Sequence, residues 1–457
     1  MAIFSSLASF FRRNKRKLLI TSAFTVSIYI LIDQLVIKKF RNFQNSLRQE
    51  LIFKQQIKQR FIQTQLDCYY TILALLPVLS LPIIDHLPVE LITQALRLKK
   101  SNPAPVSNVN SDLTTDNLNL LENNTKPESK LLVYVNKSKI ELWNLLKIKT
   151  ITRTLSLMYS ISGLLLITRL QLNILARRSY LESAILMAGV KSKDTSSQVS
   201  AHENYIIEQS YLSLSWWLLN KGWLNLNAVI EPLVIASFEK INPKSELSIN
   251  QFESILLNIS KDLEYSPALI SNLFPLHYDD LIETLLNTNP DLISHLENPE
   301  SNLYKLVNET KLIISTGENA PYFRHLYHEL IVNNLSTLSD QLILSLNHGS
   351  TSLLLSSSNL KDEEKITEIN QELETKLFKL ASFLAQLSIQ NSILIDNNNL
   401  SENDQDLEGF IDELNDPRGI IGDSGRNGEL TGNVYVNNMN ELEELDDFSA
   451  GVYSNYE

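Results

Sequence analysis

Apolar residues recur along most of this 457-residue chain at steps of three and four, the spacing that places them on one face of an α-helix. The first long run comprises Phe40, Phe43, Leu47, Leu51, Ile57, Phe61 and Leu66. Because no glycine or proline interrupts this run before Pro77, it predicts a long amphipathic helix. A second uninterrupted pattern, from about Ile140 to Leu186, predicts a long central helix.

Shorter amphipathic segments lie on both sides of the central helix. Pro88 opens a short helix whose apolar face carries Leu91, Ile92, Ala95 and Leu98. The same spacing predicts further helices over Tyr205–Leu219, Ala228–Phe238, Ile249–Leu263, Leu276–Leu286, Tyr322–Leu346, Glu363–Leu394 and Met439–Tyr456. The apolar pattern therefore predicts an all-α fold.

Breaks in the apolar pattern set the organisation of the body, residues 40–395. The polar stretches 99–130 and 191–200 have no periodicity and predict mobile loops. Pro77 and Pro82 predict a helix end followed by a turn. Between these breaks the body is predicted to be one bundle of helices.

The segment before the first amphipathic helix, Leu18–Ile37, is almost entirely apolar. It is about long enough to cross a hydrocarbon core of roughly 30 Å. A basic N-terminal segment, 1–17, precedes it, while Asp33 and Gln34 lie near one end, within reach of the interface. A secretory signal has a shorter apolar core and a small-residue cleavage site. The pattern therefore favours an uncleaved transmembrane anchor over a signal peptide or a buried core helix.

The central helix contains a second uncharged stretch, Thr154–Thr168, between Arg153 and Arg169. Its 15 residues are short for a bilayer span. Its serine and threonine content fits a helix surrounded by other helices. We therefore expect a buried central helix here and one transmembrane helix in the chain.

Charge is concentrated at the two ends of the chain. Residues 396–457 hold 16 acidic and 2 basic side chains, so this tail accounts for the whole net charge of −12 and leaves the rest close to neutral. The glycine, asparagine and acidic content of 396–438 predicts disorder, followed by a C-terminal amphipathic helix within 439–457 that packs on the bundle. A near-neutral body excludes nucleic acid as a partner. Basic residues flank the anchor on both sides, so charge alone does not choose its orientation.

The composition argues against several kinds of chemistry. Cys68 is the only cysteine, so the chain has no intramolecular disulfide, which fits a reducing cytosol. Seven of the twelve glycines lie between Gly409 and Gly451, which nearly excludes glycine-rich phosphate loops from the body. No nucleophile elbow or dinucleotide-binding fingerprint is present, and we expect no cofactor.

The best metal candidate is the pair His325 and His328, which share a helical face. A zinc-protease helix needs His-Glu-x-x-His, and no nearby cysteine or third histidine completes a site. We interpret the pair as solvated or capping residues. The sequence therefore predicts no metal site and a protein that is not an enzyme.

Tryptophans mark two places in the chain. Trp216, Trp217 and Trp223 cluster in one predicted helix and at its exit, which favours core packing. Trp143 instead lies at the start of the central helix, directly after a predicted loop. There the indole either covers a helix end or contacts a partner, and the pattern alone leaves both interpretations open.

Several motifs surround this tryptophan: Leu142-Trp143-x-x-Leu146-Lys147, then Arg169-Leu-Gln171-Leu-Asn173-Ile and Tyr180-Leu181. Together they resemble the most recognisable block of the peroxin-3 family, membrane-anchored docking proteins of peroxisome biogenesis. Residues 61–77 are similar to the family's first soluble helix and residues 445–453 to its closing helix. Where animal members carry Gly-Gly, this chain has Ala176-Arg177-Arg178, as is typical of fungal members.

The resemblance implies an all-α cytosolic domain, shaped as an elongated bundle and preceded by one transmembrane helix. Its chief partner would be peroxin-19, the soluble receptor of newly made peroxisomal membrane proteins. An amphipathic helix of peroxin-19 would lie in a hydrophobic groove at the membrane-distal end of the bundle. The residues carried over by position to this groove are Leu131, Leu132, Lys139, Trp143, Leu146 and Lys147. An aromatic anchor, leucines and a few charges suit such a groove.

The same resemblance implies a single-pass location in the peroxisomal membrane with the C-terminal domain in the cytosol, and residence in the endoplasmic reticulum during biogenesis. Lipids of these membranes, and inheritance and pexophagy adaptors, would be further partners. Two other classes remain open: an organelle tether that recruits such adaptors, and a membrane-anchored enzyme. An enzyme would need an acid–base pair in a cleft, which the sequence does not show.

Overall fold

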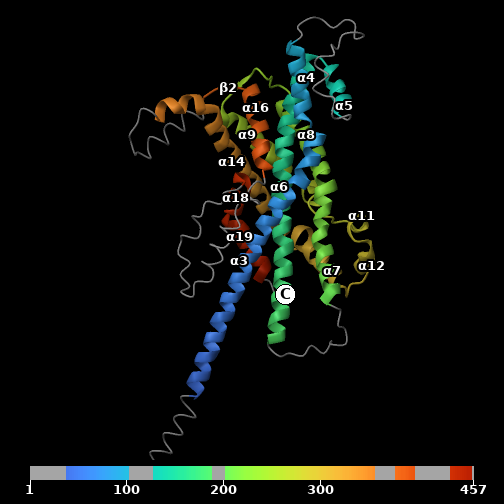
Figure 1. Ribbon diagram of the computed structural model, residues 1–457, viewed down its shortest axis with the longest axis vertical. Coiled ribbons are helices and arrows are strands. Elements are labelled where there is room, and N and C mark those ends of the chain that lie inside the picture. The colour runs from blue at the N-terminus through green and yellow to red at the C-terminus, as the bar shows by residue number, and fades with distance from the viewer. Residues whose placement is uncertain (1–37, 102–126, 188–200, 356–375, 397–432, 455–457) are drawn as a thin grey trace, which may run out of the picture. The chain divides into compact units, whose positions relative to one another are not determined.

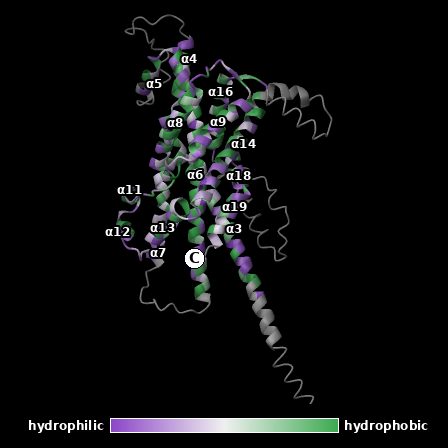
Figure 2. Ribbon diagram, turned by 180° about the vertical axis from the view of Figure 1, so that it is seen from behind, coloured by the Kyte–Doolittle hydropathy of each residue, from purple (hydrophilic) through white to green (hydrophobic). Residues whose placement is uncertain are grey.

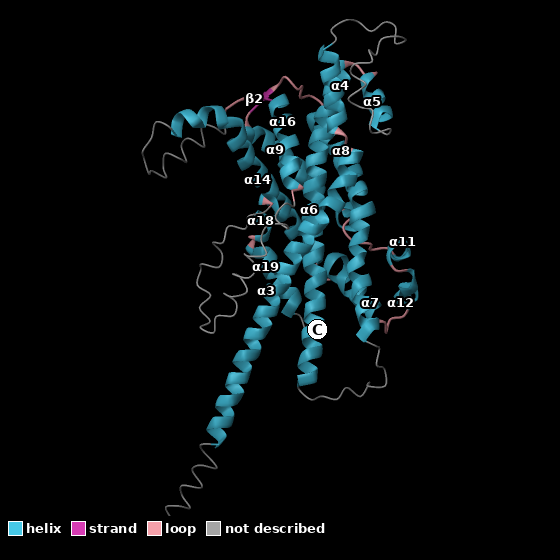
Figure 3. Cartoon of the chain, viewed as in Figure 1, coloured by secondary structure: helices cyan, strands magenta, loops and turns pink. Residues whose placement is uncertain are grey.

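A computed structural model describes residues 38–101, 127–187, 201–355, 376–396 and 433–454. The chain divides into two compact units, residues 1–63 and 64–457. Helix α3 (Lys38–His86) begins in the first unit and ends in the second. The described residues are helical apart from turns and two short strands, so the all-α prediction is confirmed (Figure 3).

Several sequence predictions fall outside the described residues. These are the basic segment 1–17, the anchor at Leu18–Ile37, the loop 191–200 and most of the acidic segment 396–438. The predicted loop 99–130 is shorter than expected, because helices cover its first three and last four positions. Its remaining residues also lie outside the described part.

Helix α6 (Lys139–Met187) is the central element of the second unit (Figure 1). It contacts α4 (Val89–Ser101), α7 (Ala201–Leu212), α8 (Trp223–Phe238), α13 (Asn302–Lys311), α14 (Ala320–Leu355), α16 (Leu380–Leu394) and α19 (Glu443–Ser454). Apolar residues run along much of α6 (Figure 2), and its side chains from Thr150 to Leu170 are all buried. The stretch Thr154–Thr168 is thus enclosed by protein.

Two described segments are long and apolar enough to span a membrane by length and composition alone, Leu51–His86 and Lys139–Ile185. In the second, 94% of the most apolar window is buried inside the fold, whereas in the first the share is 44%. A core helix of a soluble domain passes the same composition test. The burial of α6 therefore accounts for its apolar character without a membrane.

Helix α3 continues through Pro77 and Pro82, so the helix end predicted there is wrong. A proline in a helix interior removes one backbone donor and costs roughly 3 kcal/mol. The inner face of α3 compensates, because Leu73, Leu76 and Ile83 are at most 1% exposed. Fully burying such a side chain contributes about 1.5–3 kcal/mol. Packing therefore overrides the local preference of the two prolines.

The other helices lie in the segments with an apolar pattern, but several begin or end at other residues than predicted. They are α5 (Pro127–Val135), α9 (Ile249–Glu264), α10 (Pro267–Ser271), α11 (Tyr278–Thr288), α12 (Ile293–Glu297) and α18 (Val434–Asn440), with single turns η2 (Ser213–Ser215), η3 (Leu218–Gly222), η4 (Pro290–Leu292) and η5 (Leu312–Thr316). The predicted helix Tyr205–Leu219 is divided between α7 and these turns, and α10, α12 and α13 were not predicted. The start of α9 is fixed by a capping box between Ser248 and Gln251.

A two-stranded antiparallel ribbon corrects the predicted helix Glu363–Leu394. Strand β1 (Glu246–Leu247) pairs with β2 (Phe378–Lys379), and α16 begins only after β2. The backbone N–H groups of Leu380 and Ala381 donate to the carbonyls of Ser245 and Pro243 at 2.9 and 3.0 Å. Because these two N–H groups are bonded to another segment, they cannot bond to carbonyls four residues earlier, and α16 does not extend to residues before Leu380.

The C-terminus forms two helices, α18 and α19, in place of the predicted single helix Met439–Tyr456. Helix α18 also begins inside the segment predicted to be disordered. Asn433, which is 4% exposed, determines this start. Its Oδ1 accepts hydrogen bonds from the N–H groups of Tyr435 and Val436, while its Nδ2 donates to three carbonyls at the end of α16. One side chain thus caps two helices.

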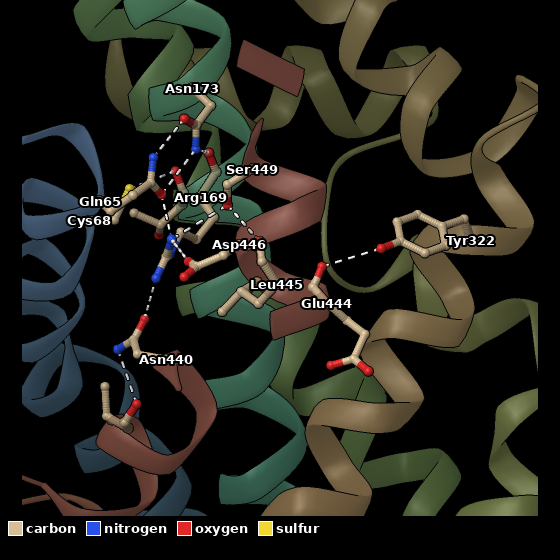
Figure 4. A network of polar contacts seen from close by, with 12 residues as sticks. Gln65, Cys68, Arg169, Asn173, Tyr322, Asn440, Glu444, Leu445, Asp446 and Ser449 are labelled. Atoms are coloured by element: carbon tan, nitrogen blue, oxygen red, sulfur yellow. Dashed lines mark hydrogen bonds and ion pairs between the residues drawn. The ribbon is translucent and has the colours of Figure 1, made fainter. Parts of the chain in front are cut away.

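Buried polar contacts attach these C-terminal helices to the centre of the fold (Figure 4). The guanidinium of Arg169 on α6 donates to Gln65 of α3, to Asn440 of α18 at 2.7 Å and to Asp446 of α19 at 3.1 Å. Asn173, one turn further along α6, accepts from the Gln65 amide at 2.8 Å. The Arg-Leu-Gln-Leu-Asn motif therefore holds four helices together.

A candidate docking surface at α4, α5 and the start of α6

Helices α4, α5 and the first turns of α6 enclose a small hydrophobic cluster that is separate from the main core. Its buried members are Val89, Ile92, Ala95, Leu96, Leu142 and Leu146. Leu131, Tyr134, Val135, Trp143 and Leu145 pack against it and are partly buried. Figure 1 shows α4 and α5 together at one end of α6. We call this set the satellite cluster.

The satellite cluster leaves large apolar side chains in solvent. Leu98 on α4 is 42% exposed, Leu132 and Val133 on α5 are 57% and 60% exposed, and Ile140 on α6 is 76% exposed. A single exposed leucine is ordinary in soluble proteins, whereas four exposed apolar side chains on three neighbouring helices make this region a candidate interaction site. With Trp143, these residues define what we call the Trp143 surface.

Polar contacts hold the three helices of the cluster in place. The Nζ of Lys99, near the end of α4, donates to the backbone carbonyl of Lys137 in the turn between α5 and α6. At the other end of α4, the guanidinium of Arg153 makes two bonds of 2.7 and 2.8 Å with the carboxylate of Glu90. Because Arg153 belongs to α6, this ion pair fixes the start of α4 against the central helix.

Helix α6 begins with a capping box formed by Ser138 and Glu141. The Ser138 hydroxyl accepts from the N–H of Glu141 at 3.2 Å, and the Glu141 carboxylate accepts from the N–H of Ser138 at 2.8 Å. The backbone hydrogen bond from Ser138 also lowers the pKa of the Glu141 carboxyl. The cap sets the first turn of α6, and with it the direction of Ile140 and Trp143.

The structure brings five of the six predicted site residues to or beside the satellite cluster, in different environments. Trp143 and Leu131 are partly buried against it, whereas Leu132 is exposed and Leu146 is buried with 8% exposure. Lys139 is exposed at the first turn of α6. Trp143 is thus a large predicted side chain that packs against the cluster and keeps part of its surface in solvent.

Lys147 differs from the other predicted residues because it lies inside the protein. Its side chain is 3% exposed, and its Nζ donates to the carbonyls of Phe238 and Ile241 at 2.6 and 2.7 Å. Burial lowers the pKa of its ammonium, and the nearby carboxylate of Glu239 partly offsets this shift. In this conformation Lys147 presents no charge to a partner.

The predicted site lacked three members of the Trp143 surface: Leu98 on α4, Val133 on α5 and the strongly exposed Ile140. Only the first four residues of α5 fall in the predicted loop 99–130, and residues 131–135 were assigned to no helix. The signal that would have found it is the apolar run Leu131-Leu132-Val133-Tyr134-Val135, directly before the capping-box serine. An apolar run next to a helix start predicts a packed segment better than a loop.

Other candidate chemistry gains no support from the geometry. His325 lies 3.9 Å from Glu329 of the same helix, and the Nδ1 of His328 lies 3.5 Å from the Ser260 hydroxyl. Among the residues that the structure describes, no three His, Cys, Asp or Glu side chains are placed to hold a metal ion. Trp217 and Trp223 are buried in the core, at 7% and 6% exposure.

Comparison with known protein families shows to which class of proteins this chain belongs. The family model of Peroxin-3 matches residues 9–455, nearly the whole chain. The chain therefore belongs to the peroxin-3 family of peroxisome biogenesis factors, and the sequence resemblance is confirmed.

Individual relatives match along most or all of their length. Peroxisomal biogenesis factor 3 of Debaryomyces hansenii is 52% identical over 461 residues, which cover 100% of both chains. Peroxisomal membrane protein PEX3 of Komagataella phaffii is 33% identical, with 98% of this chain and 99% of the relative covered. Peroxisomal biogenesis factor 3 of Saccharomyces cerevisiae is 27% identical, covering 90% and 87% of the two chains.

Proposed function

We propose that this protein is a docking receptor of the peroxisomal membrane that binds peroxin-19 through the Trp143 surface, and so takes part in the insertion of peroxisomal membrane proteins. The observation that carries the proposal is the partial burial of Trp143 beside exposed apolar side chains of α4, α5 and α6. Membership of the peroxin-3 family supports the assignment to peroxisome biogenesis.

The chemistry of the Trp143 surface suits an amphipathic helix. Such a helix places its apolar face against leucines, valines and one aromatic anchor, with charges at the rim to set its register. Leu132, Val133 and Ile140 offer the apolar area, and exposed Lys139 and Lys100 lie near it in the chain. These basic residues favour a partner helix with carboxylates at its edges.

The topology proposed with this function has the anchor at Leu18–Ile37 in the membrane and the helical bundle in the cytosol. Peroxisomal and endoplasmic reticulum lipids would then contact the basic residues that flank the anchor. The name of the Komagataella phaffii relative, a peroxisomal membrane protein, supports the location.

A second function, recruitment of inheritance or pexophagy adaptors by an organelle tether, is compatible with docking and would use other surfaces. A membrane-anchored enzyme has less support, because the chain belongs to a family of peroxisome biogenesis factors. Binding of one soluble partner in equal stoichiometry supports docking, whereas capture of organelle-bound partners supports tethering.

The test of the docking site is Trp143→Ala in the full-length protein, measured for affinity to peroxin-19 and for thermal midpoint on the same preparation. We expect a loss of about 2–4 kcal/mol of binding free energy, or roughly 30- to 1,000-fold in affinity, the range of interface hot spots. The thermal midpoint should change little, because the indole is only partly buried.

The matched control is Trp216→Ala, since Trp216 is also partly buried but lies in the turn before η3, outside the satellite cluster. This variant should retain wild-type affinity. A Trp143→Ala protein with a much lower midpoint and unchanged affinity for peroxin-19 would refute the assignment of the site.

A further inference from the structure

Lys147 lies one helical turn after Trp143, and side chains four positions apart share a face of an α-helix. Lys139 lies one turn before Trp143 on the same face. The two lysines nevertheless have opposite surroundings, since Lys139 is exposed and Lys147 is 3% exposed. The environment of Lys147 therefore comes from a neighbouring helix.

That neighbour is α8, whose C-terminal end lies over Lys147. The last carbonyl groups of a helix have no partner within the helix, and a cation at this end is favourable. Lys147 donates to Phe238, the last residue of α8, at 2.6 Å and to Ile241, just beyond it, at 2.7 Å. A lysine of α6 thus caps α8, with charge-assisted bonds that are stronger than neutral ones.

A second contact joins the same two helices nearby. The Nζ of Lys149 lies 2.6 Å from the carboxylate of Glu231, two turns before the end of α8. The turn of α6 after Trp143 is therefore attached to α8 at two points. In the same part of α6, Leu142 and Leu146 are buried in the satellite cluster together with residues of α4.

We propose that Lys147 is a positioning residue for the Trp143 surface and does not itself contact the partner. By capping α8, it fixes the rotation of the first turns of α6 and so the direction in which Trp143 faces. Loss of the cap leaves two buried carbonyls without their cation and lets this end of α6 move relative to α8. This inference rests on the proposed docking function of the same surface.

The test uses the full-length protein labelled with 5-fluorotryptophan, which has four tryptophans and hence four fluorine resonances. Trp143→Phe assigns the resonance of interest. In Lys147→Met we expect the Trp143 resonance to shift or broaden without partner present, while the other three resonances stay in place. Affinity for peroxin-19 should fall roughly 2- to 30-fold, the range for residues that act on a site without touching the ligand.

Salt dependence separates positioning from direct contact. Lys139→Met is the matched control, since it removes an exposed lysine from the same face of α6. It should leave the Trp143 resonance unchanged and reduce the dependence of peroxin-19 affinity on ionic strength. Lys147→Met should leave that salt dependence at the wild-type level. If Lys147→Met does not fold, Lys147→Gln carries the test, because its side chain is neutral and one bond shorter, so it cannot keep both charge-assisted bonds and should still displace the resonance.

An unchanged Trp143 resonance in the Lys147 variants would overturn the inference, and so would a reduced salt dependence like that of Lys139→Met. Failure of the docking proposal is distinguishable from both outcomes. It would appear as wild-type affinity in Trp143→Ala, whatever the fluorine spectra of the Lys147 variants show.

Discussion

Four buried cations of α6 bond to its neighbouring helices. Lys147 caps α8, Arg153 pairs with Glu90 of α4, and Arg169 joins α3, α18 and α19. Arg177 donates to Glu309 of α13 and to a carbonyl of α19. Removing a buried cation that has several acceptors leaves those acceptors without their charged donor, which costs more than the loss of a surface ion pair. These side chains therefore fix the arrangement of the bundle.

Arg169→Met should lower the free energy of unfolding by about 2–3 kcal/mol, because Gln65, Asn440 and Asp446 lose their common donor. Thermal or chemical unfolding of the full-length protein measures the loss. The matched control is Arg178→Met, which removes a more exposed pair with Glu182 on the same helix and should cost less than about 1 kcal/mol. Equal losses in the two variants would show that the buried network is not a main source of stability.

The local sequence was enough to single out Trp143 as a candidate contact residue, but it could not show that Lys139 is exposed whereas Lys147 is buried. Helical periodicity places both lysines on the face of the tryptophan, one turn to each side. The difference between them depends on the end of α8, which lies about 90 residues later in the chain. The same limit applies to Arg169, since its acceptors on α18 and α19 are more than 270 residues away. Contacts over such separations leave no mark in a local pattern.

Helices with a long apolar stripe were the most predictable elements. The prediction Ile249–Leu263 differs from α9 by one residue, because a capping box and a regular stripe both mark that helix. Predictions were wrong where distant packing decides the local structure. Buried leucines keep α3 helical through Pro77 and Pro82, and pairing with β1 delays the start of α16. Helix α5 has only nine residues, too few to show a period.

Asn433 caps α18 and bonds to the end of α16, so its replacement tests how much the contact between these two helices stabilises the protein. Asn433→Ala removes the cap of α18 and three bonds to the end of α16, and should destabilise the protein by about 2–4 kcal/mol. Asn433→Asp keeps the acceptor for the α18 N–H groups but removes the donors, so its cost should be intermediate. Equal stability of the aspartate variant and the wild type would show that the bonds to α16 contribute little.

The main core and the satellite cluster differ in size and in what they support. The main core surrounds α6 and joins segments from both ends of the second unit, including the C-terminal helices. The satellite cluster has six buried members among the described residues, far fewer than the main core, and it carries the exposed apolar residues of the Trp143 surface. A small cluster opens locally at lower free energy than a large core. A partner that covers it should therefore stabilise α4 and α5 most.

Amide hydrogen exchange of the full-length protein, with and without peroxin-19, tests whether the Trp143 surface is the docking site. Binding should slow exchange in α4, in α5 and in the first turns of α6, and Trp143→Ala should remove this protection at the same peroxin-19 concentration. The main-core turns of α6, around Leu164, should exchange slowly in both states, because they are already fully buried. Peroxin-19 binding that leaves exchange in α4, α5 and the start of α6 unchanged, and protects another face of the bundle, would show that the docking site lies elsewhere.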